Sequence, residues 1–68
     1  MYDNGLLLAE KGRQRLTNKE IAEKARRSVP TVTNVLNGDP NVSVDTLEAV
    51  AGALGVHLSK LWPKSEAA

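Results

Sequence analysis

Apolar residues recur at helical spacing along much of this chain, and the clearest pair of such patterns lies between Thr17 and Gly38. The two patterns are short and are separated by only three residues, 26–28. The dipeptide Asn37-Gly38 follows the second pattern and is typical of the end of a helix. The first apolar face consists of Ile21, Ala22 and Ala25, and the second of Val32, Val35 and Leu36. The spacing predicts two short amphipathic helices in succession.

Each of these helices has a start signal in the sequence. Thr17 and Glu20 have the spacing of a capping box, in which the hydroxyl accepts from the amide of the third helical residue and the carboxylate accepts from the amide of the cap. A helix is therefore expected to begin near Asn18. Ser28 offers the second cap, and Pro30 falls in the following first turn, where its missing amide hydrogen costs nothing.

Two helices this short need a support, because isolated helices below ~12 residues are marginal in water. Ala22 is small enough for the two axes to approach closely across the short turn, so the pair is expected to form a helix-turn-helix unit. A first helix is predicted near the amino terminus, with Asp3 or Asn4 as its cap. Gly12 interrupts its pattern, so this helix either stops near Lys11 or continues imperfectly.

The strongest amphipathic pattern follows Ser43, which is the predicted cap of a fourth helix. This helix should lie under the helix-turn-helix unit as the floor of the core, and Gly55 is expected to end it. Its apolar positions are Val44, Leu47, Val50, Ala51 and Leu54.

A short fifth helix is predicted after Gly55, closed by Pro63. Its apolar positions are Val56, Leu58, Leu61 and Trp62. Trp62 suits either core packing or a dimer contact, and core packing is the expected role because we assign no other large side chain to the centre. His57 precedes this helix at a cap position, and we assign it no chemistry.

Size and composition limit what the chain can be. Its 68 residues predict a single domain, residues 1–63, and a frayed carboxyl-terminal tail, residues 64–68. There is no cysteine and no apolar run of membrane-spanning length, so a soluble, cytoplasmic protein is expected. Met1 and the polar tail favour a whole protein over an excised domain.

The charge is unevenly distributed along the chain, although the net charge is only +1. Residues 11–30 hold seven basic and two acidic side chains, whereas residues 38–68 hold two basic and four acidic ones. The positive charge therefore accompanies the predicted helix-turn-helix, where a phosphate backbone would meet it. The other explanation is that these lysines and arginines only keep a small helical surface in solution.

Residues 18–37 resemble the helix-turn-helix of the lambda-repressor-like family, also called the Cro and repressor or XRE family. The residues that match its buried positions are Ile21, Ala22, Ala25, Val32 and Val35. The match continues through Asn37-Gly38, Thr46-Leu47 and Leu54-Gly55-Val56. Residues 21–38 also resemble the lac-repressor headpiece, but the downstream segments 54–56 and 61–62 favour the first family. The resemblance implies an all-α fold, a compact five-helix lambda-repressor-like DNA-binding domain.

The resemblance also implies that the second helix of the pair enters the major groove of DNA. The residues at its base-contacting positions are Val29, Pro30, Thr33 and Asn34. The residues at phosphate-contacting positions are Thr17, Asn18, Ser28, Thr31 and Asn37, and the basic residues Arg26 and Arg27 of the turn are further candidate phosphate contacts. Asn34 can form two hydrogen bonds with adenine, whereas Val29 and Pro30 can only touch a thymine methyl group. A simpler explanation is that Thr33 and Asn34 form a solvated helix face, and that Thr17 and Ser28 only cap their helices.

Arg26 and Arg27 depart from the family pattern, which favours glycine and then an apolar residue in this turn. The glycine normally adopts a left-handed conformation, which costs a residue with a Cβ atom roughly 1–2 kcal/mol. We therefore consider two hypotheses. Either the arginines contact phosphate and the strain is tolerated for binding, or the turn is altered and both side chains are only solvated.

These observations predict a sequence-specific DNA-binding transcriptional regulator, most like a small phage or mobile-element repressor of the Cro type. Its expected partner is a double-stranded, two-fold operator, bound by a homodimer. The alternative is a protein-interaction module with the same fold, such as an antiactivator, antirepressor or antitoxin. An enzyme is not expected, because the chain has one histidine, no cysteine and no glycine-rich phosphate loop. No cofactor, metal, membrane or small-molecule substrate is predicted.

Overall fold

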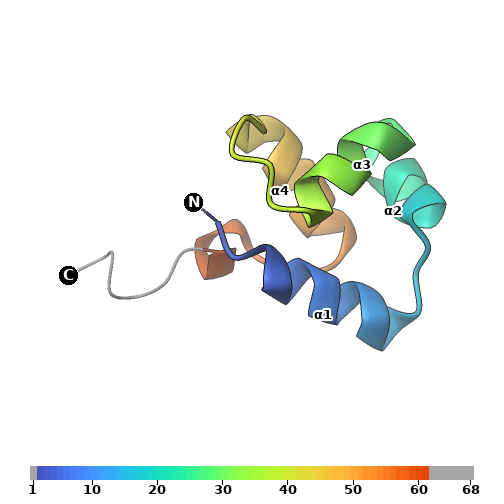
Figure 1. Ribbon diagram of the computed structural model, residues 1–68. Coiled ribbons are helices and arrows are strands. Elements are labelled where there is room, and N and C mark those ends of the chain that lie inside the picture. Colours follow the sequence, from blue (N-terminus) through green and yellow to red (C-terminus); the bar gives the residue numbers. More distant parts are fainter. Residues whose placement is uncertain (1, 62–68) are drawn as a thin grey trace.

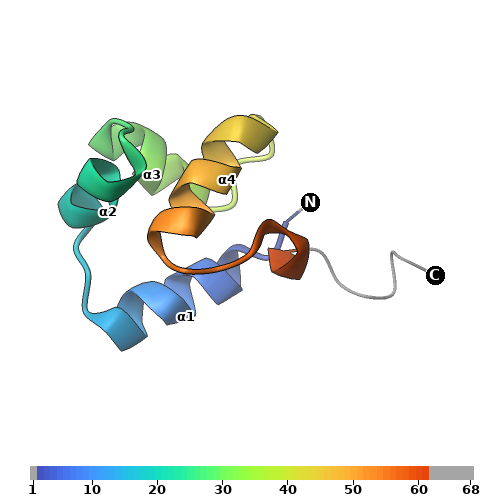
Figure 2. The same cartoon turned by 180° about the vertical axis from the view of Figure 1, so that it is seen from behind.

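The computed structural model describes residues 2–61 of the 68-residue chain. This part consists of helices and connecting turns, and the predicted all-α fold is confirmed. Its elements are α1 (Asn4–Gln14), α2 (Asn18–Ala25), α3 (Val29–Leu36), α4 (Val44–Ala53) and the 3₁₀ turn η1 (Leu58–Leu61). α1 lies along one side of the molecule, α2 and α3 form an angled pair at one end, and α2 packs against α4 (Figure 1 and Figure 2). Within the described residues, no helix is both long and apolar enough to cross a bilayer.

The prediction of five helices is wrong for residues 2–61, which contain four α-helices and one 3₁₀ turn. The residues after Gly55 make a single turn, in which Lys60 N–H donates to the His57 carbonyl at 2.9 Å. Leu61 joins this turn to the start of α1, because its carbonyl accepts from Asp3 N–H at 2.6 Å and its side chain is fully buried. The predicted capping position of His57 is confirmed, since its Nδ1 accepts from Ser59 N–H at 3.2 Å.

The start signals of α2 and α3 are confirmed by their hydrogen bonds. The Thr17 hydroxyl accepts from Glu20 N–H at 3.1 Å, and a Glu20 carboxylate oxygen accepts from Thr17 N–H at 2.8 Å. The backbone hydrogen bond from Thr17 is the largest cause that lowers the pKa of Glu20. Ser28 Oγ accepts from Thr31 N–H at 3.3 Å, and Pro30 lies in the first turn of α3.

α1 begins at the predicted cap Asp3 and runs past Gly12 to Gln14, so the continued helix is the correct alternative. Its last turn is held in place by a long-range contact, in which Gln14 Nε2 donates to the Leu54 carbonyl at 2.7 Å. This bond joins the end of α1 to the end of α4. It stabilises the last turn of α1, which Gly12 in the helix interior weakens by about 1 kcal/mol.

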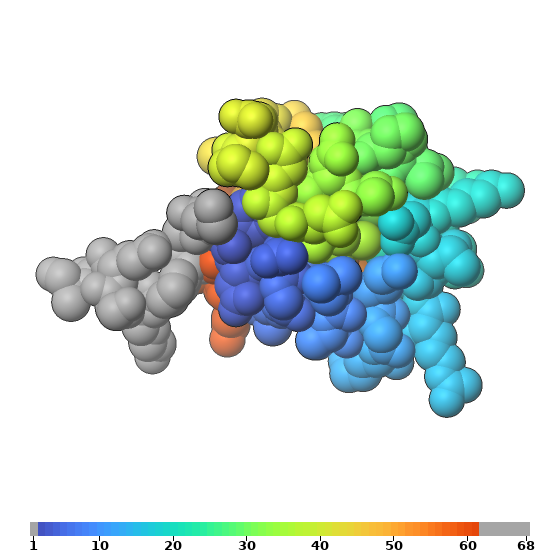
Figure 3. All heavy atoms as spheres, viewed as in Figure 1, coloured from blue at the N-terminus to red at the C-terminus, as the bar shows by residue number. Residues whose placement is uncertain are grey.

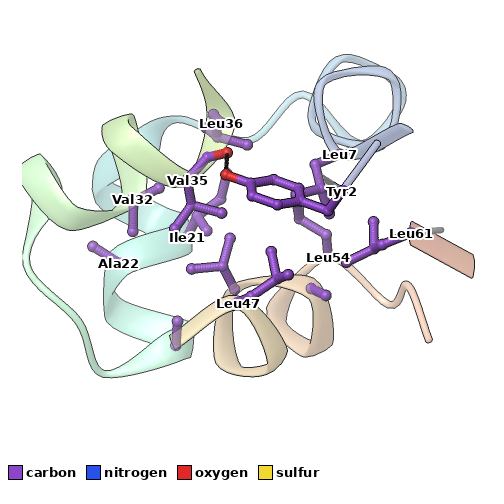
Figure 4. Close-up of a cluster of buried hydrophobic side chains, with 13 residues drawn as sticks. Tyr2, Leu7, Ile21, Ala22, Val32, Val35, Leu36, Leu47, Leu54 and Leu61 are labelled. Carbon is purple, nitrogen blue, oxygen red and sulfur yellow. Dashed lines mark hydrogen bonds between the residues drawn. The ribbon is translucent and has the colours of Figure 1, made fainter. Parts of the chain in front are cut away.

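Tyr2 contributes a large aromatic side chain to the core, a role for which the sequence analysis named only Trp62. Its side chain lies among residues from α1, α3 and α4 and is only 8% exposed (Figure 4). The phenol donates a hydrogen bond to the carbonyl of Val35 in α3. Burial, and secondarily the charge of Asp39, raises the pKa of Tyr2 above its ordinary value. Trp62 lies outside the described residues.

The apolar faces predicted for α2 and α3 are buried as expected, with all six residues 7% exposed or less. In α4, Leu47, Val50, Ala51 and the adjoining Leu54 are buried, but Val44 is 61% exposed, which corrects its assignment to the core. Val44 is the first residue of α4 and therefore lies beyond the part of the helix that the core covers.

All four α-helices end with the same backbone arrangement, a residue in the left-handed region followed by an amide that reaches back five residues. The left-handed residues are Arg15 (φ 55°), Arg26 (φ 57°), Gly38 (φ 83°) and Gly55 (φ 75°). The amide-to-carbonyl bonds are Leu16 to Lys11 at 3.1 Å, Arg27 to Ala22 at 3.0 Å, Asp39 to Asn34 at 3.1 Å and Val56 to Ala51 at 2.8 Å. This is the Schellman motif, which satisfies carbonyls at the end of a helix.

Candidate nucleic-acid interface

The outer face of α3 holds the four side chains that the sequence placed at base-contacting positions. Val29 is 41% exposed, Pro30 and Asn34 are also exposed, and Thr33 is half-buried. Thr33 and Asn34 follow Val29 and Pro30 by four residues, so the two pairs occupy neighbouring turns of one helix face. This face combines an apolar tip with one exposed amide.

The residue at the start of α2 contacts the same face. Asn18 Nδ2 donates to the Thr33 hydroxyl at 3.0 Å, a contact between side chains fifteen positions apart. The other amide atom, Asn18 Oδ1, is buried and has no hydrogen-bond partner among the described residues. Asn18 was predicted to contact phosphate, and in this structure its side chain is hydrogen-bonded to Thr33, which was predicted to contact a base.

The amino termini of α2 and α3 present capping hydroxyls. Thr17 and Ser28 are exposed, and Ser28 Oγ lies 2.8 Å from Thr31 Oγ1, so the two hydroxyls at the start of α3 form one polar cluster. Helix amino termini attract anions because their first amides lack helical partners and their dipole is positive. Asn37 is exposed at the other end of α3, with its backbone amide bonded to the Thr33 carbonyl at 3.0 Å.

The two arginines of the turn differ in their surroundings. Arg26 is exposed and has the left-handed backbone that the family pattern normally gives to glycine. The Arg27 side chain is instead engaged, because its Nη2 donates to Asp45 Oδ2 at 2.9 Å and its Nη1 to the Arg26 carbonyl at 3.1 Å. Asp45 is 85% exposed, so this ion pair contributes at most about 1 kcal/mol. A phosphate at Arg27 would compete with Asp45.

Comparison with known proteins gives these features a context. A helix-turn-helix family model matches residues 8–61, which include α2, α3 and α4 completely. The chain belongs to the lambda-repressor-like helix-turn-helix family. It is 42% identical over 48 residues to the immunity repressor protein of Bacillus phage phi105, a match that covers 71% of this chain. The same match covers 33% of that repressor, so the chain spans about a third of its relative's length. No solved structure gives a significant match.

Within this family member, a shallow groove separates α3 from the loop that leads to α4. Thr31 and Asn34 line one side of it, and the other lining residues are Asp39, Asn41, Val42, Ser43 and Thr46. The sequence analysis assigns this segment only the helix cap Ser43, and the position of residues 39–43 beside the exposed face of α3 was not predicted. The signal that pointed to it was the polar sequence Asp39-Pro40-Asn41 directly after the helix-turn-helix.

Basic side chains gather around the end of α1 and along α2. Long side chains from this part of the chain, coloured light blue to cyan, extend from one end of the molecule (Figure 3). Arg13 is paired with Glu10 at 2.6 Å, and this hydrogen bond is the largest cause that lowers the pKa of Glu10. The other exposed basic side chains of this region are Arg15, Lys19, Lys24 and Arg26. The charge asymmetry of the sequence therefore becomes a basic end next to the amino-terminal half of the helix-turn-helix.

Proposed function

We propose that this chain is a sequence-specific DNA-binding transcriptional regulator, and specifically a repressor. The observation that carries the proposal is the exposed face of α3, where Asn34 and Thr33 lie one turn from an apolar tip. Capped helix amino termini and basic side chains flank that face. Membership of the lambda-repressor-like family and the similarity to a phage immunity repressor support the same function.

In the proposed complex α3 enters the major groove. Asn34 is the residue best suited to base recognition, because a carboxamide can bond the N6 amino group and N7 of adenine together. Val29 and Pro30 supply apolar contact that suits a thymine methyl group. The proposed phosphate contacts are Thr17, Asn18, Ser28, Thr31 and Asn37, which the family resemblance implies, together with Arg26 and Arg27 of the turn.

We propose further that the operator has two-fold symmetry and that a homodimer binds it. A single α3 contacts few base pairs, and pairing two copies doubles the recognised length. The half-sites would then lie ~10 base pairs apart, so that both recognition helices face the same side of the duplex. Inserting half a helical turn between the half-sites should abolish simultaneous binding.

Selection from a random duplex library tests the proposal, followed by affinity measurements on every single-base-pair variant of the enriched sequence. Asn34→Ala should cost ~1–3 kcal/mol at one base position and relax the preference there. Asn37→Ala is the matched control, because it removes the same amide from a proposed phosphate contact and should weaken all duplexes equally. Equal loss on every sequence for Asn34→Ala would show that Asn34 does not contact a base.

A second candidate function is a protein-interaction module of the antiactivator, antirepressor or antitoxin type. The apolar tip of α3 favours it, because Val29 is 41% exposed and Pro30 cannot donate a hydrogen bond. The library experiment separates the two functions. A specific regulator enriches one sequence, whereas an interaction module enriches none.

A further inference from the structure

The contact between Asn18 and Thr33 has a consequence for base recognition, and this inference rests on the proposed DNA-binding function. Asn18 is the first residue of α2, and Thr33 lies on the face of α3 proposed to meet the bases. Their side chains are joined at 3.0 Å from Nδ2 to Oγ1 in a half-buried position. One hydrogen-bonding direction of the Thr33 hydroxyl is therefore already used within the protein.

The direction of this bond follows from the inventory of donors and acceptors. A carboxamide nitrogen carries two hydrogens and no acceptor, so the Thr33 hydroxyl must accept. Turning the amide over would exchange its nitrogen with Oδ1, which is buried without a partner. Two unpaired N–H donors would then be buried in place of one unpaired acceptor, at a greater desolvation cost.

Accepting from Asn18 restricts where the Thr33 hydroxyl hydrogen can lie. Of the three staggered positions about the Cβ–Oγ1 bond, the one that points to Asn18 must hold a lone pair. The hydrogen is left with the other two positions, and a threonine in a helix can direct it to the carbonyl of the preceding turn or away from the helix. Directed away from the helix, the hydrogen needs an acceptor on the DNA; directed to the carbonyl, it leaves a lone pair that needs a donor.

We propose that Asn18 is a positioning residue for specificity, which keeps the hydrogen of the Thr33 hydroxyl free to donate to a base edge of the DNA. The base edge opposite Thr33 should then carry an acceptor, such as guanine O6 or N7, thymine O4 or adenine N7. The cytosine N4 amino group is disfavoured there, because it also donates. Asn18 thereby contributes to recognition without touching a base.

Asn18→Asp reverses the donor and acceptor roles and is the decisive variant. A carboxylate only accepts, so the Thr33 hydroxyl must donate to it and can only accept from DNA. An acidic residue in the first turn of α2 suits the helix dipole, so the variant is expected to fold. Its added negative charge weakens binding to all DNA, and the measured quantity is therefore the ratio of affinities between base variants.

The experiment uses the full chain and the duplex enriched by the unmodified protein, together with all its single-base-pair variants. Thr33→Val should flatten the preference at one base pair by about 5-fold, the loss expected for one hydrogen bond. Asn18→Asp should shift the preference at that same base pair toward a base with an amino group. Asn37→Asp, which adds the same charge at the end of α3, should lower all affinities without changing any ratio.

The outcomes separate this inference from the function on which it rests. If the unmodified protein enriches a sequence but Asn18→Asp behaves like Asn37→Asp, the inference is overturned and the proposed function stands. If Thr33→Val keeps every base preference, the inference is also overturned, since the hydroxyl hydrogen then stays within the protein. If Asn18→Asp does not fold by circular dichroism, Asn18→Ala replaces it and must reduce the same preference for the inference to stand. If the unmodified protein enriches nothing, both proposals fail together.

Discussion

The first two helices of this domain end on arginine and the last two end on glycine, although all four have the same Schellman backbone. Arg15 and Arg26 have φ angles of 55° and 57°, and Gly38 and Gly55 have φ angles of 83° and 75°. This conformation strains a residue with a Cβ atom by roughly 1–2 kcal/mol, and glycine adopts it without that strain. Among the described residues, side chains with a Cβ atom take this conformation only in the basic amino-terminal half of the chain.

The two glycines are also unlike each other. A Cβ atom at Gly38 would lie 3.1 Å from Cγ of Asn4, whose Nδ2 donates to the Leu36 carbonyl at 2.8 Å. A Cβ atom at Gly55 would have no atom within 4 Å apart from those of its two neighbours in the chain. The glycine that ends α3 is thus required by packing and by conformation, and the glycine that ends α4 by conformation alone.

Gly38→Ala should have the largest effect among changes at the helix ends. We expect a loss of about 2–3 kcal/mol, the sum of left-handed strain and the displaced Asn4 hydrogen bond. Chemical denaturation monitored by circular dichroism measures it. The control is the same change in an Asn4→Ala background, where the excess over simple strain should disappear. An equal loss in both backgrounds would contradict the role of Asn4.

Tyr2→Phe tests the other support at the end of α3, and should cost about 1 kcal/mol through the lost bond to the Val35 carbonyl. The raised pKa of Tyr2 means that the folded protein keeps the phenol protonated while the unfolded chain ionises above pH 10.0. The stability that this phenol contributes is complete below that pH and is lost as pH rises through its folded-state pKa. Denaturation at a series of alkaline pH values measures this contribution. The free energy of unfolding of Tyr2→Phe should decline less steeply with pH than that of the unmodified protein.

Tyr2 is the only tyrosine in the chain, so the ultraviolet absorbance of tyrosinate reports its ionisation directly. Lysines also titrate in this range and affect both proteins alike, so Tyr2→Phe serves as the control. An identical alkaline decline in the two proteins would show that burial of the phenol does not couple to folding.

Gly55→Ala should cost only about 1 kcal/mol, because the substitution meets strain without a clash. A melting temperature lower by ~4–8 °C is the corresponding shift for a domain of this size. The loss of stability in Gly38→Ala must be clearly larger than the loss in Gly55→Ala. A loss as large as that of Gly38→Ala would show that the two helix ends are equivalent, contrary to the packing at Asn4.

Arg15→Gly and Arg26→Gly should each stabilise the fold, by about 0.5–1 kcal/mol, since relief of strain exceeds the entropy that glycine adds to the unfolded chain. If Arg26 contacts phosphate, its replacement should also lower the slope of log affinity against log salt by ~1. Arg27→Ala should lower the salt slope less than Arg26→Gly does, because the Arg27 guanidinium is already paired with Asp45. A more stable Arg26→Gly protein with unchanged affinity and salt slope would leave the arginine unexplained by DNA contact.

Local signals predicted much of this structure, and long-range contacts account for what they missed. The caps Thr17, Ser28 and Ser43 act within three residues, and the sequence alone therefore indicated where α2, α3 and α4 begin. The left-handed turn at Arg26 came from the family resemblance. The buried position of Tyr2 could not be predicted, because it depends on Val35, thirty-three positions away.

The candidate site divides in the same way. The exposed face of α3 followed from the pattern of apolar and polar residues around it. The contacts of Asn18 with Thr33 and of Arg27 with Asp45 join residues fifteen and eighteen positions apart, and depend on the crossing angles of the helices. Helical spacing within a single segment carries no information about those angles.

The most direct test of DNA recognition by α3 is a nuclear magnetic resonance titration, in which the selected duplex is added to isotope-labelled protein and the backbone amide signals are followed. We expect the largest shifts along α3, at the start of α2 and in the turn at Arg26, with little change in η1 and the first turns of α1. Shifts centred on α1 or η1, or no shifts with any duplex, would contradict DNA recognition by α3.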